Sequence, residues 1–248
     1  MKIEKKVACI TGGGRGIGRA ISLRLAAAGM EVAVTDVSLE NANKVVSEIL
    51  DAGGKAKGYQ ADVLNSAEVK AVTAQVLQDF GQIDVLVNNA GGSAGLLNKL
   101  SNFKDTTEEI WSWVLDLNIN GTLRFTHAVL NQMVARNTGK IINIASIAAE
   151  VGIVNRVDYS AAKGAVVSMS KALAMEVGPH GITVNCISPG LISRTEDISP
   201  HPGTCLGRNG APAEVASLVA FLASSEADFI TGVNYTIDGG RTLGPKGA

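Results

Sequence analysis

The chain has 248 residues, of which 46% are hydrophobic and 18% are charged, and its mean hydropathy is +0.20. This composition excludes disordered and collagen-like chains and predicts a globular protein with a large core. The formal net charge of -1 lacks the basic footprint of proteins that bind nucleic acid or anionic membranes. We therefore expect a small-molecule partner, with neither nucleic acid nor a membrane involved.

Neither a disulfide framework nor a metal site is predicted. The cysteines are odd in number and form no CxxC pair, and the histidines lack the spacing of metal ligands: Cys9, Cys186 and Cys205; His127, His180 and His201. The apolar run Val7 to Ile10 is too short for the core of a signal peptide, and no stretch reaches the length of a membrane span. These features favour a cytoplasmic protein.

Short apolar, β-branched runs alternate with helix-length segments along the chain. Such runs are typical of strands that are buried on both faces of a sheet, and they cover residues 7–11, 31–36, 83–87, 140–146, 182–187 and 234–237. Asn65, with Glu68 three residues later, indicates the start of one intervening helix. The alternation predicts an α/β fold with a doubly wound parallel sheet and helices on both faces.

Nothing in the composition divides the chain, so we expect a single dinucleotide-binding and catalytic domain over residues 1–248. The longest irregular segment covers about 190–210. A loop of that length is usually functional, and we expect it to form a lid over a site. A second loop, residues 91–106, follows the middle strand.

A glycine-rich turn joins the first strand to the first helix. Its glycines, Gly12, Gly16 and Gly18, would bring helix N–H groups to an anionic pyrophosphate. The spacing is not GxGxxG, and a P-loop is excluded because Arg19 and Ala20 stand where that motif needs Lys and Ser or Thr. The alternative is a turn that serves only strand-to-helix packing.

Asp36 ends the second strand, where a carboxylate can accept both hydroxyls of an adenosine ribose. It favours NAD over NADP, because a carboxylate about 4 Å from a 2'-phosphate would repel it. Arg15 in the glycine turn opposes this preference, since a guanidinium can bind that phosphate. The alternatives are a turn or cap role for Asp36 and a solvated position for Arg15.

Tyr159 and Lys163 are spaced i and i+4 in a segment of helical character, which places them on one helix face. A nearby ammonium, and a nicotinium ring if one is bound, would lower the pKa of the phenol toward neutrality and make it a general acid/base. Ser146, at the end of the fifth strand, could hydrogen-bond a carbonyl or alkoxide oxygen, or could cap a loop. Alone, a Tyr with a nearby Lys is also common on ordinary amphipathic helices.

Taken together, these motifs resemble those of the short-chain dehydrogenase/reductase family over essentially the whole chain. The ordered matches are Thr11-Gly12-xxx-Gly16-x-Gly18, Asp62-Val63, Asn88-Asn-Ala-Gly91, Asn118, Ser146, Tyr159-xxx-Lys163, Pro189-Gly190 and Ile237-Asp-Gly-Gly240. The resemblance implies an NAD-dependent oxidoreductase that interconverts a secondary alcohol and its ketone. It also implies a homotetramer.

The resemblance also implies roles for individual residues. Tyr159 would exchange the substrate proton, Ser146 would orient the substrate oxygen, and Lys163 would lower the tyrosine pKa and bind the nicotinamide ribose. The backbone of Asn118 would support a relay water, although that residue could instead serve its own helix as a kink. The implied cofactor contacts are Gly12, Arg15, Gly16, Ile17, Gly18, Asp36, Asp62, Val63, Asn89, Tyr159, Lys163 and Ile192. For Asn88 we favour a structural role, as an amide that braces the sheet.

The substrate side departs from the family pattern. Arg194 stands where many members have a threonine that contacts the carboxamide, so Ser193 or Thr195 would take that contact. The small, apolar residues 92–97 favour a medium-sized, uncharged secondary alcohol or ketone, cyclic and aromatic ones included. Arg194 could instead receive the phosphate of an acyl-thioester carrier, which makes a 3-oxoacyl-thioester reductase the alternative.

Two other classes compete with an enzyme of this kind. A dinucleotide-sensing scaffold would keep the fold without turnover. A methyltransferase on a related sheet would use the glycine turn and Asp36. Neither class explains why Ser146, Tyr159 and Lys163 occur together.

Overall fold

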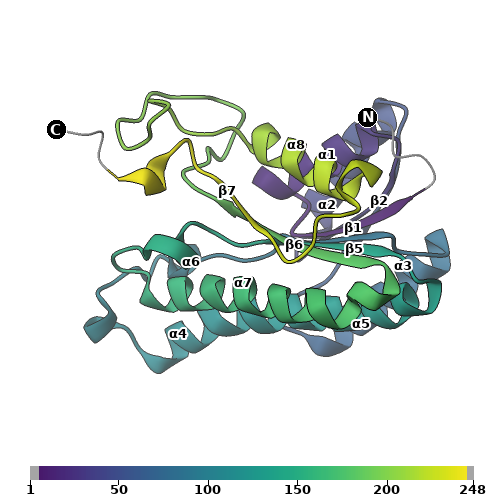
Figure 1. The fold of residues 1–248 in the computed structure, drawn as a ribbon, viewed down its shortest axis with the longest axis horizontal. Helices are drawn as coiled ribbons and strands as arrows, with labels where there is room; N and C mark the ends of the chain where they lie inside the picture. Colours follow the sequence, from purple (N-terminus) through teal and green to yellow (C-terminus); the bar gives the residue numbers. More distant parts are fainter. Residues whose placement is uncertain (1–5, 245–248) are drawn as a thin grey trace.

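A seven-stranded, fully parallel sheet lies between two layers of helices in the computed structural model, which describes residues 6–244 (Figure 1). The strand order is β3-β2-β1-β4-β5-β6-β7. The strands are β1 Val7–Thr11, β2 Glu31–Asp36, β3 Lys55–Gln60, β4 Val85–Asn88, β5 Gly139–Ile144, β6 Ile182–Pro189 and β7 Asn234–Ile237. The predicted doubly wound α/β architecture is confirmed.

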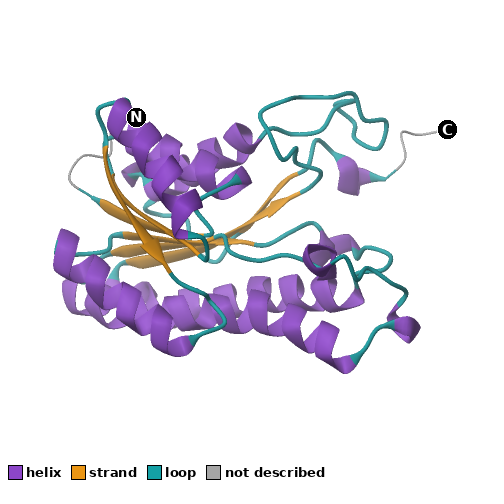
Figure 2. Cartoon of the chain, turned by 180° about the vertical axis from the view of Figure 1, so that it is seen from behind, coloured by secondary structure: helices purple, strands orange, loops and turns teal. Residues whose placement is uncertain are grey.

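The helices cover both faces of the sheet (Figure 2). One face carries α1 Gly16–Ala27, α2 Leu39–Asp51 and α8 Pro212–Ala223, and the other carries α3 Ser66–Phe80, α5 Gly121–Arg136 and α7 Val157–Val177. The shorter helices α4 Glu108–Leu115 and α6 Ala148–Val151 lie on the α7 side in Figure 1. Each layer closes its own apolar core against the sheet, as two-faced burial of the strands requires.

The strand β3 was missed, and β5 was predicted to end two residues too late. The strand β3 carries Lys55 and Lys57 and has only one buried side chain, Tyr59, because it forms an edge of the sheet. It therefore lacks the continuous apolar run that marks the central strands. The strand β5 ends at Ile144, so Ser146 lies two residues beyond it rather than at its last position.

The order of the strands creates a crevice at their carboxyl edge. The strand β1 pairs with β2 on one side and with β4 on the other, so the connections after β1 and β4 lead to opposite faces of the sheet. Open α/β sheets bind ligands at such a switch point. Thr11, Asp36 and Asn88 end their strands at this edge, and Ser146 follows β5 there.

The start of α3 is fixed by the side-chain cap that the sequence predicts. Asn65 Oδ1 accepts hydrogen bonds from the N–H groups of Ala67 (3.0 Å) and Glu68 (3.3 Å). Glu68 in turn accepts from Asn65 Nδ2 (2.7 Å) and from the backbone N–H of Asp62 (2.9 Å). The cap therefore also holds the segment at Asp62, which follows β3. In the described part of the chain, no helix is long and apolar enough to cross a membrane.

Replacing this cap tests its contribution to stability. Asn65→Ala should lower the free energy of unfolding by about 1 kcal/mol, because two N–H groups of the first turn lose their acceptor. Asn65→Asp keeps the acceptor oxygen and should lose much less. Urea unfolding followed by circular dichroism measures both variants, and equal losses would contradict the capping role.

Candidate active site

The glycine-rich turn lies at the switch point and leaves space where side chains would otherwise stand. Gly12 and Gly16 have left-handed backbone angles (φ +60° and +52°), which glycine adopts without strain. A Cβ at Gly18 would overlap the carbonyl oxygen of Gly12, so the helix can begin this close to β1 only without a side chain. The helix α1 then points its N-terminal N–H groups, with no acidic residue in the first turn, toward the crevice.

Asp36 lies beside this turn and is 5% exposed. Its carboxylate accepts hydrogen bonds from the backbone N–H of Gly14 (3.0 Å) and of Ser38 (3.0 Å). One oxygen is bonded to each donor, so lone pairs of both remain for ribose hydroxyls. Ser38 is the cap of α2, because its Oγ accepts from Asn41 N (3.3 Å).

Asn89 joins the turn to the end of β4. Its Nδ2 donates to the carbonyl oxygens of Thr11 (3.0 Å) and Gly12 (2.9 Å). The hydroxyl of Thr11 accepts from the backbone N–H groups of Asn89 and Ala90, both at 3.0 Å. These four bonds fix the turn relative to the adjacent loop. Asn89 thus holds the glycine turn and the end of β4 together.

Ser146, Tyr159 and Lys163 meet on the α7 side of the crevice. Ser146 Oγ accepts from Ala148 N (3.1 Å), and interaction with the Ser146 hydroxyl lowers the pKa of the Tyr159 phenol. Lys163 Nζ lies 5.7 Å from the centre of the Tyr159 ring and donates to the carbonyl oxygen of Ile144 (2.8 Å). Two neighbouring turns of α7 and the end of β5 therefore supply a hydroxyl, a phenol and an amine in one place.

Burial controls the ionisation of this group in the protein without cofactor. It raises the pKa of Tyr159, against the opposing effects of the Ser146 hydroxyl and the Arg156 charge. Burial also lowers the pKa of Lys163 to about 8. The phenol pKa was expected to fall beside the Lys163 ammonium. It rises instead, because burial of the phenol disfavours its charged form.

Asn118 lies in a π-helical turn, Asp116–Asn120, between α4 and α5. Its Oδ1 accepts from Gly92 N (3.1 Å), and its Nδ2 donates to the carbonyl oxygens of Gly92 (2.8 Å) and Val114 (2.8 Å). A Cβ at Gly91 would contact both Asn118 Oδ1 and Lys163 Nζ. The side chain therefore fixes the loop after β4 beside Lys163, and π-turns of this kind are frequent at functional sites.

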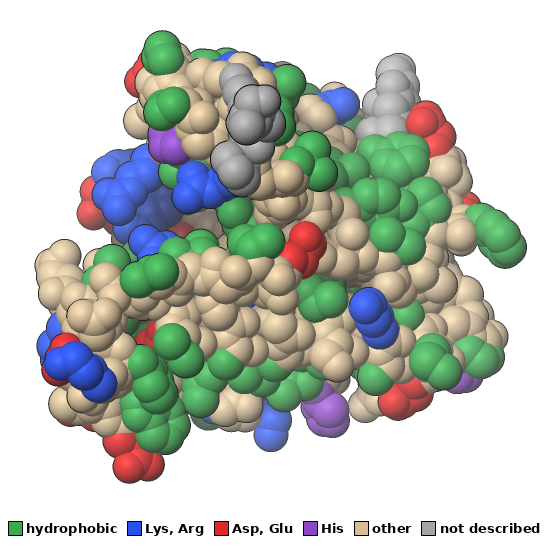
Figure 3. Space-filling model, turned by 60° about the vertical axis from the view of Figure 1, so that its left-hand side comes forward, with side chains coloured by type: hydrophobic (Ala, Val, Ile, Leu, Met, Phe, Trp, Pro, Cys, Tyr) green, Lys and Arg blue, Asp and Glu red, His purple; other side chains and the backbone are tan. Residues whose placement is uncertain are grey.

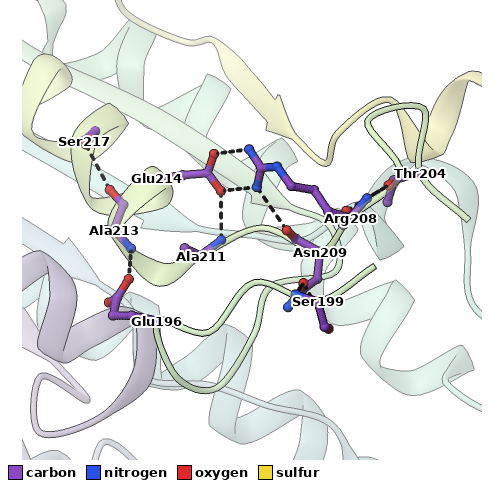
Figure 4. A network of polar contacts seen from close by, with 9 residues as sticks. All are labelled: Glu196, Ser199, Thr204, Arg208, Asn209, Ala211, Ala213, Glu214 and Ser217. Atoms are coloured by element: carbon purple, nitrogen blue, oxygen red, sulfur yellow. Dashed lines mark hydrogen bonds and ion pairs between the residues drawn. The ribbon is translucent and has the colours of Figure 1, made fainter. Parts of the chain in front are cut away.

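The loop at residues 190–210, which the sequence predicts to be a lid, is held in place at its C-terminal end (Figure 4). Arg208 and Glu214 form a two-pronged ion pair with N–O distances of 2.9 and 2.7 Å, and Glu214 also accepts from Ala211 N (2.8 Å). These donors lower the pKa of Glu214 to about 2. The Thr204 hydroxyl donates to the carbonyl oxygen of Arg208 (2.8 Å). The lid therefore meets α8 through a defined polar anchor.

The N-terminal end of this loop carries Ser193, Arg194 and Thr195, where the chain departs from the family pattern. Ile192 forms a bridge with Gly210, and its side chain packs against the sheet core. The Thr195 hydroxyl donates to Asp197 Oδ2 (2.9 Å), and Ser193 Oγ lies 3.4 Å from Thr195 Oγ1 and accepts from Thr195 N (3.3 Å). Arg194 is exposed.

The remaining predicted cofactor residues lie at the same edge of the sheet. Arg15 caps α1 in an extended conformation and is exposed, while Ile17 lies in the first turn of that helix. The Asp62 carboxylate accepts from Leu64 N (2.9 Å), and Val63 is buried against Gly121. Together with the glycine turn and Asp36, these positions outline a site for an extended dinucleotide. Among the described residues, no group of His, Cys, Asp and Glu could hold a metal ion.

A buried polar ladder connects the strands beneath the site to α5 and α7, and of its members the sequence predicted only Asn88, as an amide that braces the sheet. Asn88 Nδ2 donates to Thr126 Oγ1 (3.0 Å) and to Asn143 Oδ1 (2.8 Å). Asn143 Nδ2 donates to Ser170 Oγ (2.8 Å), which also accepts from Cys186 Sγ (3.0 Å). The sequence signal for the ladder is that Asn88 and Asn143 are polar residues inside strands that are otherwise apolar.

The family model described as short chain dehydrogenase matches residues 6–200 of the chain. The chain belongs to the short-chain dehydrogenase family. Members of this family are oxidoreductases that use NAD or NADP and act on small molecules.

Relatives of the same length have several named activities. The chain is 39% identical over 249 residues to a cyclohexanol dehydrogenase from Acinetobacter sp., with 97% of this chain and 96% of the relative covered. It is 40% identical over 248 residues to a 3-oxoacyl-[acyl-carrier-protein] reductase from Synechocystis sp., covering 97% and 98%. The crystal structure of a short-chain type dehydrogenase/reductase from Mycobacterium marinum superposes with a TM-score of 0.91 at 33% identity, covering 98% and 97%.

The ionisation of Lys163 predicts a pH dependence of stability. Between about pH 8, its pKa in the folded protein, and its ordinary value of 10.5, the unfolded chain binds a proton that the folded chain does not. The free energy of unfolding should therefore rise with pH across this window, by up to about 3 kcal/mol, and level off outside it. Urea unfolding of the cofactor-free protein measures this rise. Lys163→Met should lack it, and a rise of equal size in that variant would contradict the assignment.

Proposed function

We propose that this protein is an NAD-dependent dehydrogenase that interconverts a secondary alcohol and its ketone. The observation that carries the proposal is the meeting of Ser146, Tyr159 and Lys163 at the open edge of the sheet, beside the glycine turn. A scaffold that only senses a dinucleotide has no need for a serine hydroxyl, a phenol and a buried amine in one place. A methyltransferase would leave this group without a role.

The residues divide the chemistry among them. Ser146 donates a hydrogen bond to the substrate oxygen, and Tyr159 takes the hydroxyl proton during oxidation or returns it during reduction. Lys163, when protonated, stabilises the phenolate and is placed to hydrogen-bond the nicotinamide ribose. The glycine turn and Asp36 would hold NAD, which would supply the hydride acceptor for the carbinol carbon. Asn118 keeps the loop at Gly92 in place beside Lys163, so the substrate oxygen and the amine stay on the same side of the phenol.

The cofactor preference follows from the charges near the glycine turn. Asp36 is buried at the edge of the turn and already accepts from Gly14 N, so its charge is fixed where an adenosine ribose would lie. A 2'-phosphate there would be repelled by several kcal/mol at about 4 Å. Arg15 is exposed and held by no polar contact among the described residues, so its attraction is screened by water. The aspartate therefore dominates, which favours NAD.

A 3-oxoacyl-thioester reductase is the second candidate. Arg194 lies exposed on the lid, where it could meet the phosphate of a carrier outside the crevice. The relative from Synechocystis sp. is named as a reductase of this kind. We keep the alcohol dehydrogenase first because Asp36 favours NAD, and because the loop at residues 92–97 is small and apolar.

We also propose the homotetramer that the family resemblance implies. Two large apolar side chains, Phe229 and Met175, lie fully or largely in solvent in the single chain, and a second subunit would cover such surface.

Removing the phenol hydroxyl tests the mechanism. Tyr159→Phe should lower kcat by about 100- to 10,000-fold, because the proton acceptor is lost. Binding of NADH, followed by its fluorescence, should remain. The assay records absorbance at 340 nm with NAD+ or NADP+ against a panel of secondary alcohols. Turnover within a few-fold of the wild type would remove Tyr159 from the reaction.

Neutralising Asp36 tests the cofactor preference. Asp36→Asn keeps an acceptor for Gly14 N but removes the charge, so the ratio of kcat/KM for NADP+ to that for NAD+ should rise at least about tenfold. Adding Arg15→Gln to this variant should reverse part of the gain, since the guanidinium is then the remaining attraction for the 2'-phosphate. Asp51→Asn, at the far end of α2, is the matched control and should leave the ratio as it is. An unchanged ratio in Asp36→Asn would refute the argument.

A further inference from the structure

Ser146 lies in a short turn, residues 146–151, which follows β5 and includes α6. We call this segment the Ser146 turn. Its backbone closes on itself, because Ala149 N donates to the carbonyl oxygen of Ser146 (3.0 Å). The Ser146 hydroxyl also accepts from Ala148 N (3.1 Å). These local bonds make the turn one compact unit, so a contact made elsewhere on it also bears on where the Ser146 hydroxyl lies.

The Ser146 turn is joined to β7 by a single acidic side chain. After Ser146 itself, Glu150 is the only polar residue of the turn. Glu150 Oε1 accepts hydrogen bonds from Asn234 Nδ2 (2.7 Å) and from Thr236 Oγ1 (2.8 Å). Side chains alternate between the two faces of a strand, so these donors stand on the same face of β7. One carboxylate oxygen thus connects the turn to two positions of the edge strand.

The strand β7 is a firm anchor for this contact. It pairs in parallel with β6, with Thr236 in register with Ser188. The amide of Asn234 is oriented from both sides, because its Nδ2 donates to Glu150 and its Oδ1 accepts from the buried hydroxyl of Ser188 (2.9 Å). The donors that face Glu150 are therefore held in place by the sheet.

The two ends of the Ser146 turn are held differently. Its start is tied to β6 through a backbone bond from Ile147 N to the carbonyl oxygen of Pro189 (3.1 Å). Its far end has little burial to hold it: Val151 is 55% exposed, and Val154 in the following loop is 83% exposed. A segment with few buried contacts is easily displaced unless polar contacts hold it. The Glu150 carboxylate supplies the side-chain hydrogen bonds that fix this end.

We propose that Glu150 is a positioning residue of the proposed reaction. Through its two bonds to β7 it keeps the Ser146 hydroxyl where that hydroxyl meets the substrate oxygen. This inference rests on the proposed function. Hydrogen bonds to a charged acceptor are stronger than those between neutral groups, which suits an acidic side chain to hold an exposed segment. The effect on the reaction is large because a misplacement of about 1 Å can cost roughly 100-fold in rate.

Removing the carboxylate gives the first readout. Glu150→Ala should lower kcat about 5- to 50-fold, because the Ser146 hydroxyl loses its fixed position. The KM for the alcohol should change less than kcat, and binding of NADH should remain, since the glycine turn is untouched. Kinetics are followed at 340 nm with the best alcohol of the panel, and the urea midpoint establishes that the variant is folded. An unchanged kcat would overturn the inference.

Two variants separate the contact from the charge. Figure 3 shows Lys and Arg side chains gathered at the indentation between the upper and lower parts of one face, so a lost negative charge could act through the electric field alone. Glu150→Gln removes the charge but keeps the acceptor oxygen, and it should retain most of kcat. Glu176→Ala removes an exposed glutamate at the far end of α7 and should keep the wild-type kcat. A loss in either variant equal to that of Glu150→Ala would contradict the positioning role.

The decisive test repeats Glu150→Ala in a chain that already carries Ser146→Ala. If Glu150 acts through the Ser146 hydroxyl, the second substitution has little left to disturb. The further loss of kcat should then be less than about threefold, a strong departure from additivity. A further loss as large as that of Glu150→Ala alone would show that Glu150 acts by another route, and would overturn the inference.

Failure of this inference is distinguishable from failure of the proposed function. If kcat falls in Tyr159→Phe and in Ser146→Ala but not in Glu150→Ala, the positioning role alone is wrong. If the wild type turns over no alcohol, ketone or thioester with either nicotinamide cofactor, the proposed function fails and takes this inference with it.

Discussion

The contact between α7 and β5 is the constraint on which the site depends. Two buried hydrogen bonds, 2.8 Å each, join them: Lys163 Nζ donates to the carbonyl oxygen of Ile144, and Asn143 Nδ2 donates to Ser170 Oγ. The two helix residues are seven positions apart, which is about two turns, so both lie on the same face of α7. A helix held at two points cannot slide or rotate. The phenol of Tyr159 is therefore kept against the hydroxyl that follows β5.

The same burial that fixes the helix also sets the charges in the site. Burial lowers the pKa of Lys163, whose Nζ donates to the carbonyl oxygen of Ile144, and raises the pKa of Tyr159. Both shifts disfavour the charged forms of the amine and the phenol. In the proposed mechanism, a positively charged nicotinamide ring beside them would favour the phenolate and oppose this effect of burial.

The sequence predicted the parts of the structure that local physics determines. The glycine turn, the cap at Asn65 and the apolar central strands depend on neighbouring residues, and all of them were placed correctly or within two residues. The edge strand β3 was missed because solvent on one side removes the apolar run. Asn143 and Ser170 were also missed. Their significance comes from partners that only the folded chain reveals.

The two sides of the crevice are held by different kinds of contact, which bears on how function varies within this family. On the nucleotide side, Asn89 and Asp36 bond to the backbone of the turn, so changing either one disturbs the cradle itself. On the substrate side, the lid is anchored through Arg208 and Glu214 at one end, while residues 194–198 between the anchors are exposed. Substitutions there leave the cradle and the Ser146 group intact. Relatives with about two-fifths of their residues in common can therefore bear names as different as cyclohexanol dehydrogenase and 3-oxoacyl-[acyl-carrier-protein] reductase.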